Sequence, residues 1–170
     1  AMYDDLCDPK KMPLIVSIEP FINETSAIAD YIVPDTVTYE SWGVSAPWAD
    51  VIAKTSTVRW PVVEPKVSRT ADGEPISLES FLITVAKRIG MPGFGDNAIG
   101  VPNSDARLGI HSAPDFYLRG FANIAYAMKR PVADASDDDL ALTGVDRYEE
   151  RIKERVSDEE WRKVATIMSR

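Results

Sequence analysis

A short apolar segment near the start constrains the fold of this chain more than any other feature. Residues 14–18 read L-I-V-S-I, an apolar run that only Ser17 interrupts. Such a run is typical of a parallel strand that is buried on both faces. The charge of Glu19 and the ring of Pro20, which cannot donate a ladder hydrogen bond, are expected to end this strand. The run therefore predicts an α/β protein.

The residues that follow complete a unit of strand, turn and strand. Asn23 and Thr25 are placed to cap a short helical turn over residues 26–29, and residues 31–33 form a second short strand. In open α/β sheets, ligands bind at the carboxyl ends of the parallel strands. At that position the carboxylate of Glu19 can accept hydrogen bonds from a ribose or from the edge of a base. The alternative interpretation of Glu19 is a solvated strand end.

The wording of this region resembles a known family. F-x-x-E-T-x-x-x-A-D-Y-I-V-P at residues 21–34 and T-Y-E-S-W-G at residues 38–43 follow the apolar strand. They resemble the molybdopterin-dinucleotide oxidoreductases of the dimethyl-sulfoxide-reductase superfamily, and the resemblance covers residues 13–90. Together with Y-L-R-G-F-A-N at residues 117–123, they are most similar to the catalytic large subunits of the tetrathionate reductase branch. Arsenate, thiosulfate and polysulfide reductases are the alternatives.

The resemblance implies a cofactor and the residues that contact it. The cofactor is molybdenum bis(molybdopterin guanine dinucleotide), whose guanosine end would lie in part of a Rossmann-like parallel-sheet domain. The positions that match the contacts of the family are Ile18, Glu19, Ser41 and Ser77. Many relatives have Asp in place of Glu19 and Lys in place of Ser41.

Structural roles compete with some of these contacts. Ser77 is equally suited to be an ordinary helix cap, and Glu79 is then the fallback contact. Glu40 is expected to cap the turn over residues 41–43 rather than to touch a ligand. No catalytic residue and no metal ligand are expected in this chain.

The resemblance also implies an assembly. The chain would be a fragment of a reductase that delivers electrons to tetrathionate or a related sulfur oxyanion, at the periplasmic or extracytoplasmic face of a membrane. Its partners would be the remainder of the large subunit, an iron-sulfur electron-transfer subunit, and a membrane quinol-oxidising subunit. An iron-sulfur cluster would be bound outside this chain, which is expected to be inactive alone. A non-enzymatic module that docks on the iron-sulfur protein is the alternative.

Charge and composition exclude several other functions. The formal net charge is −8 and the pI is about 4.7, so nucleic acid and an anionic membrane surface would repel the chain. A lone cysteine, Cys7, cannot form an internal disulfide or hold an iron-sulfur cluster, and with the lone His111 it cannot make a zinc site.

The rest of the chain is predicted to be mainly helical. Residues 1–12 are expected to be a cloning remnant and a lead-in, 13–90 a partial cofactor-binding domain, and 91–170 a loop and a helical extension. A strand is expected over residues 55–63, and an amphipathic helix follows Ser77 and ends at Gly90. Residues 91–114 are expected to be a long loop or the entry to a subfamily insertion.

Further helices are expected over residues 115–129 and in the last third. Each of the two central helices should bury one apolar face. In the helix that ends at Gly90 this face consists of Leu78, Phe81, Leu82, Val85, Ala86 and Ile89. In the helix over residues 115–129 it consists of Tyr117, Phe121, Ile124, Ala125 and Met128. Asp137–Asp139 is expected to start a helix, and S-D-E-E at residues 157–160 is a capping box. Trp42, Trp48 and Trp60 are expected to pack in a core or at its edge, and the lining of a substrate funnel or a subunit contact is the alternative.

Overall fold

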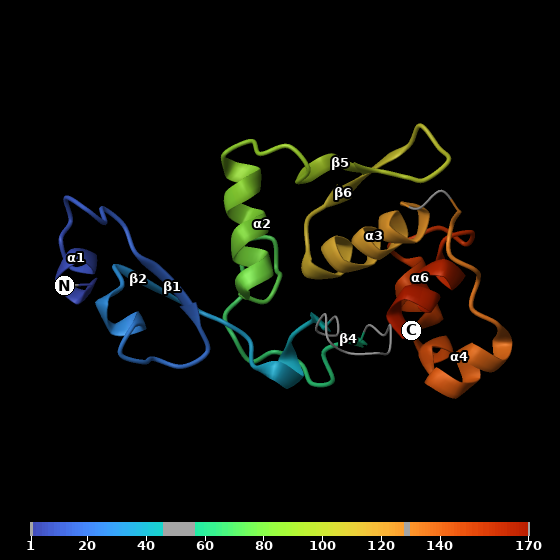
Figure 1. The fold of residues 1–170 in the computed structure, drawn as a ribbon, viewed down its shortest axis with the longest axis horizontal. Helices are drawn as coiled ribbons and strands as arrows, with labels where there is room; N and C mark the ends of the chain where they lie inside the picture. The colour runs from blue at the N-terminus through green and yellow to red at the C-terminus, as the bar shows by residue number, and fades with distance from the viewer. Residues whose placement is uncertain (1, 46–56, 128–129, 170) are drawn as a thin grey trace. The chain divides into compact units, whose positions relative to one another are not determined.

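The computed structural model describes residues 2–45, 57–127 and 130–169 (Figure 1). The chain forms two compact units that alternate along the sequence. The first unit comprises Ala1–Ser41 and Pro61–Leu82, and the second comprises Trp42–Trp60 and Ile83–Arg170. The expected boundary at residue 90, between a cofactor-binding domain and a helical extension, stays a prediction.

The first unit contains the predicted strand, turn and strand. Its elements are the helix α1 (Met2–Leu6), the strand β1 (Val16–Glu19), the 3-10 helix η1 (Ser26–Ile28), the strand β2 (Tyr31–Pro34) and the 3-10 helix η2 (Thr38–Glu40). The strands β1 and β2 pair in parallel, with Val16 opposite Tyr31 and Glu19 opposite Pro34. The mixed helix and strand content confirms the α/β prediction.

Side chains of the connecting turn set the geometry of this pair. Asn23 Oδ1 accepts hydrogen bonds from the backbone N–H groups of Thr25 and Ser26, both at 2.9 Å. Thr25 provides no side-chain cap, so only the Asn23 half of the predicted capping is confirmed. Asp30 Oδ2 accepts from the backbone N–H of Ile15 at 2.8 Å, which ties the start of β2 to the residue before β1.

The apolar run is less buried than the sequence predicts. Leu14 lies outside the strand and is 56% exposed, and Val16 and Tyr31 are also exposed. The prediction of burial on both faces is therefore wrong for the described residues. The reason is that β1 and β2 form a sheet of two strands, and none of the residues in α1 is buried against it.

The strands of the second unit form two antiparallel pairs. The strands β3 (Gly43–Ser45) and β4 (Thr57–Arg59) make one pair, and β5 (Gly95–Gly100) and β6 (Arg107–Ile110) make the other. The prediction of a strand over residues 55–63 is confirmed for the residues of β4 and is wrong for residues 60–63, which lie beyond the end of the strand. Residues 55 and 56 lie outside the described part. The prediction of a long loop over 91–114 is wrong, because this segment contains the β5–β6 hairpin. A register shift between Gly95 and Ile99 breaks its alternation, which hides it from sequence patterns.

The helices of the chain follow the predicted order. They are α2 (Leu78–Arg88), which runs from the first unit into the second, and in the second unit α3 (Ala113–Tyr126), α4 (Asp137–Thr143), η3 (Val145–Tyr148), α5 (Glu149–Lys153) and α6 (Trp161–Ser169). Gly90 ends α2 with a φ of +66°, a conformation that glycine adopts at no steric cost. The acidic run starts α4, where the Ser136 hydroxyl accepts from the Asp139 N–H.

The core of the second unit lies between α3 and α6. Its buried apolar residues are Trp42, Leu118, Phe121, Ala122, Ala135, Leu140, Ile152, Val156, Trp161, Val164 and Ala165. The ring of Trp42 packs 4.3 Å from Trp60 and 5.6 Å from Tyr117, measured between ring centroids. These two tryptophans therefore have the predicted packing role, and Trp48 lies outside the described residues.

The buried faces of α2 and α3 differ from the predicted ones. In α2 the buried residues are Ser80, Ile83 and Ala86, whereas Leu82 is 51% exposed and Ile89, just after the helix, is 67% exposed. In α3, Leu118, Arg119, Phe121, Ala122 and Ala125 are buried and Ile124 is exposed. The predictions of these two faces are wrong in part, because the spacing of apolar residues does not show which side of a helix the rest of the chain covers. Met128 lies outside the described residues.

A buried ion pair joins α3 to the start of α6. Arg119 Nη1 donates to Glu160 Oε2 at 2.7 Å, and Nη2 donates to Oε1 at 3.2 Å. The exposed fractions of the two side chains are 1% and 3%. The Ser157 N–H also donates to Glu160 Oε2 at 2.8 Å, which confirms one arm of the predicted capping box. Burial disfavours the charge of Glu160, but the bonds from Arg119 and Ser157 outweigh it and lower the pKa of Glu160.

Removing one partner of this pair should strongly destabilise the second unit. We expect Arg119→Ala to lower the free energy of unfolding by about 3–5 kcal/mol, because Glu160 stays buried without its partner. Asp158→Ala, which removes only an exposed ion pair with Lys153, should cost less than about 1 kcal/mol. Urea unfolding of the parent chain and of the two variants measures these losses of stability. Equal midpoints for the two variants would contradict the assigned role of Arg119.

The lowered pKa of Glu160 predicts a dependence of stability on pH. A carboxyl group whose pKa is lower in the folded chain stabilises the fold above the pKa that it has in the unfolded chain. This stabilisation is lost as the pH falls through the folded pKa. We expect the acid-side loss of stability to be shallower in Glu160→Gln than in the parent, as measured by urea unfolding between about pH 6 and pH 3. Parallel pH profiles would show that Glu160 does not contribute.

The free edge of β1 predicts self-association. Within the described residues β1 pairs only with β2, and an unpaired strand edge is a template for pairing with another chain. We expect the average mass measured by light scattering to rise with protein concentration. Val16→Lys should reduce this rise, whereas Leu142→Lys, a change on the exposed side of α4, should leave it unchanged. A monomer at every concentration would contradict this prediction.

Candidate functional site

The carboxyl end of the β1–β2 pair holds two of the residues predicted to bind a cofactor. Ile18 and Glu19 are the last two residues of β1, and both are half-buried. The Glu19 carbonyl oxygen accepts a hydrogen bond from the Asp35 N–H at 3.2 Å. No side chain or backbone group of the described residues bonds to the Glu19 carboxylate. This carboxylate can therefore accept hydrogen bonds from a ligand without losing a bond to any of the described residues.

Asp35 is a residue of this site that sequence analysis missed. It directly follows β2, and its Oδ1 accepts from the Thr36 N–H at 2.7 Å and from the Leu78 N–H at 3.0 Å. Leu78 is the first residue of α2. An acid directly after a strand that ends in proline was the available signal, but no spacing rule links it to a helix start 43 residues later.

Ser77 has the capping role that was the alternative to ligand contact. Its hydroxyl accepts from the Ser80 N–H at 3.2 Å, and the Ser80 hydroxyl accepts from the Ser77 N–H at 2.9 Å. Both side chains are buried. The reciprocal pair satisfies two N–H groups at the helix start. Glu79, the fallback contact, lies in the first turn of α2.

Glu40 is structural, although not at the place that the sequence predicts. Its Oε2 accepts from the Val37 N–H at 3.3 Å, at the start of η2, and its Oε1 accepts from the Lys66 N–H at 3.2 Å. The prediction of a cap over residues 41–43 is corrected, because both carboxylate oxygens are used elsewhere. Ser41 is half-buried in extended backbone directly after η2.

The structure thus links two of the predicted positions in the first unit, Glu19 and Ser77, through Asp35. The end of β1, Asp35 and the start of α2 form a continuous chain of hydrogen bonds, so Glu19 and Ser77 flank the same residue. The partial positive charge at the start of α2 favours a negatively charged or hydrogen-bond-accepting group there. That these residues contact a cofactor stays a prediction.

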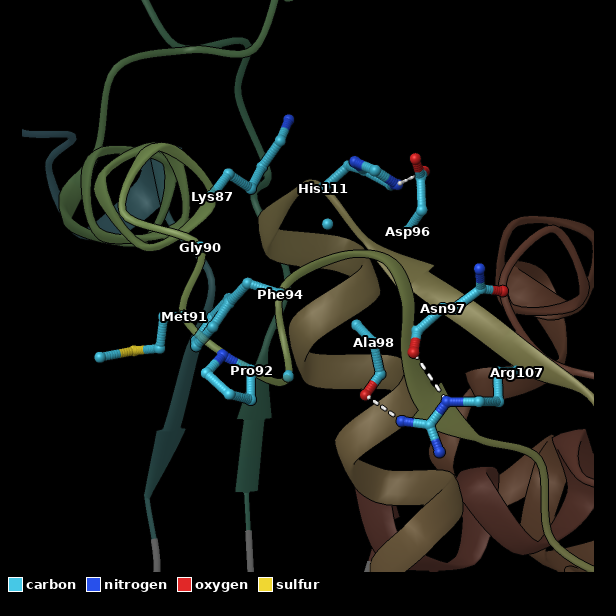
Figure 2. A pocket seen from close by; sticks show the side chains of 12 residues that line it. Lys87, Gly90, Met91, Pro92, Phe94, Asp96, Asn97, Ala98, Arg107 and His111 are labelled. Carbon is cyan, nitrogen blue, oxygen red and sulfur yellow. Dashed lines mark hydrogen bonds and ion pairs between the residues drawn. The ribbon is translucent and has the colours of Figure 1, made fainter.

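The second unit has a separate hollow of about 530 Å³, shown in Figure 2. It lies between the end of α2, the loop after it and the β5–β6 hairpin. Met91, Pro92 and Phe94 provide apolar walls, and polar groups come from the hairpin.

The polar groups of the hollow bond mostly to one another. Arg107 donates from Nε to the Asn97 carbonyl at 2.7 Å and from Nη2 to the Ala98 carbonyl at 3.0 Å (Figure 2). His111 Nε2 lies 3.1 Å from Asp96 Oδ1. The bonds from Arg107 join the two strands of the hairpin beside Asn97, whose φ is +51°, so they are explained by the conformation of the hairpin. We assign no ligand to this hollow.

Neither a metal site nor a membrane span is found in the described residues. No group of three or more His, Cys, Asp or Glu side chains is placed to hold a metal ion. In the same part of the chain, no helix has the length and apolar character required to cross a bilayer.

Comparison with known proteins finds relatives over nearly the whole chain. It is 51% identical over 98% of its length to the A subunit of the tetrathionate reductase of Salmonella typhimurium, and 34% identical over 97% to the corresponding protein of Archaeoglobus fulgidus. It is 30% identical over 97% to the A subunit of the selenate reductase of Mesobacillus selenatarsenatis. In each case the chain spans 16% of the length of the relative. No protein-family model and no solved structure matches the chain.

The capping role of Ser77 can be tested without a ligand. We expect Ser77→Ala to lower the free energy of unfolding by about 1 kcal/mol, because the Ser80 N–H loses its acceptor. Ser77→Asp keeps an acceptor and should retain most of the stability. Ser169→Ala, which removes only a bond to the preceding turn of α6, serves as the control in urea unfolding. Full stability of Ser77→Ala would exclude the cap.

Proposed function

We propose a function from the premise that the chain belongs to the family of tetrathionate and selenate reductase A subunits, over the 16% of their length that it matches. In this proposal the chain holds the guanosine end of a molybdenum bis(molybdopterin guanine dinucleotide) cofactor. The observation that carries the proposal is the Glu19 carboxylate, which is half-buried and has no partner among the described residues at the carboxyl end of a parallel strand. Ligands of open α/β sheets bind at such ends.

The residues present fit a guanosine. Its ribose has hydroxyl donors and its base has N–H donors, and the carboxylate of Glu19 is an acceptor for either. The neighbouring Ile18 would supply backbone and apolar contact. Ser41 and Ser77 are the remaining proposed contacts. The Ser77 hydroxyl already accepts one bond from the Ser80 N–H, so its O–H and its second lone pair remain for a ligand.

The role of this chain in the reaction is binding and orientation. When bound, the molybdenum centre and its pterins supply the two-electron redox chemistry. The described residues provide neither a metal-ligand set nor a pair of cysteines, so the proposed part of this segment is to fix one end of the cofactor. Positioning of this kind contributes to rate because it fixes the reacting group relative to its substrate.

For the whole protein we propose the reduction of tetrathionate or of a related sulfur oxyanion. This choice follows the 51% identity to a protein of a tetrathionate reductase, compared with 30% to a protein of a selenate reductase. The proposed partners are the remainder of the large subunit, an iron-sulfur electron-transfer subunit, and a membrane quinol-oxidising subunit. The proposed location is the periplasmic or extracytoplasmic face of the membrane, with an iron-sulfur cluster bound outside this segment.

A docking module is the second candidate function. The observation that favours it is the set of exposed apolar side chains on and beside α2, at Leu78, Leu82, Val85 and Ile89. Such a stripe is expected where a helix packs on a further protein surface. The two candidates differ in the role of Glu19, since docking through α2 does not require its carboxylate.

Cofactor occupancy in the whole reductase distinguishes the two. We expect Glu19→Ala to lower the content of molybdenum and of guanine released from the purified enzyme, because the guanosine loses an acceptor at the strand end. Glu24→Ala removes a nearby exposed carboxylate and serves as the matched control. Normal molybdenum and guanine content in Glu19→Ala would contradict the assignment of Glu19.

A further inference from the structure

We infer that Asp35 is a positioning residue that fixes the end of β1 relative to the first turn of α2. Through these two elements it positions Glu19 relative to Ser77. This inference rests on the proposed function, because it concerns the geometry of the proposed guanosine site. The proposed role of Asp35 does not include a contact with the nucleotide.

The main chain of Asp35 fixes the strand side of the site. The last residue pair of the parallel ladder is Glu19 with Pro34. The next residue, Asp35, donates its N–H to the Glu19 carbonyl at 3.2 Å. The ladder therefore continues one bond beyond the strands, and the backbone of Glu19 is held from its carboxyl side.

The side chain of Asp35 fixes the helix side. Oδ1 accepts from the N–H of Leu78 at 3.0 Å, and the first N–H groups of a helix have no partner within the helix. A negative charge at this position also interacts favourably with the helix dipole. The backbone N–H and the hydroxyl of the buried Thr36 donate to the same oxygen at 2.7 and 3.4 Å, which restricts the rotation of the carboxylate.

This bond has a different role from an ordinary cap. The local cap of α2 is Ser77, whose hydroxyl serves the N–H of Ser80. Asp35 serves a different N–H and comes from a strand end, so its bond joins two elements instead of closing one. Asp35 therefore links the backbone of Glu19 to the residue that directly follows Ser77.

Amide exchange in the 170-residue chain tests the positioning without a ligand. We expect Asp35→Ala to speed the hydrogen exchange of the Leu78 amide about fivefold or more and to shift the Glu19 resonances. Asp35→Asn keeps an acceptor of the same shape and should restore most of the protection. Asp139→Ala removes a carboxylate from the start of α4 and should leave Leu78 unchanged. If Asp35→Ala does not fold, Asp35→Glu, which displaces the carboxylate by one methylene, replaces it with the same expected direction.

Titration with GMP, followed at the Glu19 and Leu78 resonances, tests the link to the site. The parent chain should bind no tighter than roughly millimolar, Asp35→Ala several-fold more weakly, and Asp35→Asn nearly as the parent. Unchanged exchange at Leu78 in Asp35→Ala would overturn the inference. Faster exchange with unchanged GMP affinity would overturn it as well, since Asp35 would then be structural only. Absence of GMP binding to the parent chain at about 10 mM would count against the proposed function, while exchange at Leu78 would still decide the role of Asp35.

Discussion

The parallel pairing of β1 with β2 is the constraint on which the candidate site depends. Parallel strands end at the same edge of a sheet, so Glu19 and the residue after β2 must be neighbours. The short connection achieves this because Asp30 holds the start of one strand against the start of the other. Once both ends are side by side, Asp35 can reach the first turn of α2. The arrangement of the site therefore depends on strand direction, and no local motif encodes the bond between Asp35 and Leu78.

The second unit depends on a different interaction, the bidentate pair of Arg119 with Glu160. Two buried charges are costly to desolvate, and a gain is possible only when most of their hydrogen-bonding groups are used. Glu160 accepts from Arg119 and from the Ser157 backbone, whereas the Nε of Arg119 is buried without a partner among the described residues. The pair is thus not fully optimised for stability. It joins α3 to the residue that directly precedes α6.

Sequence reasoning predicted the elements whose signals are local. Apolar runs, caps and turn glycines gave β1, β2, the start and end of α2, and the acidic start of α4. It failed where the outcome depends on distant residues. The β5–β6 hairpin was missed because a register shift breaks its alternation, and the buried stripe of α2 was misassigned because burial depends on partners. For the site, resemblance supplied Glu19 and Ser77, but Asp35 could be found only from a bond between residues 43 positions apart.

The exposed apolar side chains of the first unit have a physical explanation, and this explanation connects the two candidate functions. A sheet of two strands is too small to be stable without packing partners, and parallel sheets occur almost only with other elements covering both of their faces. The chain spans 16% of the length of its relatives, so most of their sequence lies outside the matched segment. Packing by further protein on β1, β2 and the exposed stripe of α2 would also lower the local dielectric constant around Glu19. A hydrogen bond to that carboxylate is stronger in such surroundings than in water, so docking and cofactor binding would reinforce each other at this strand end.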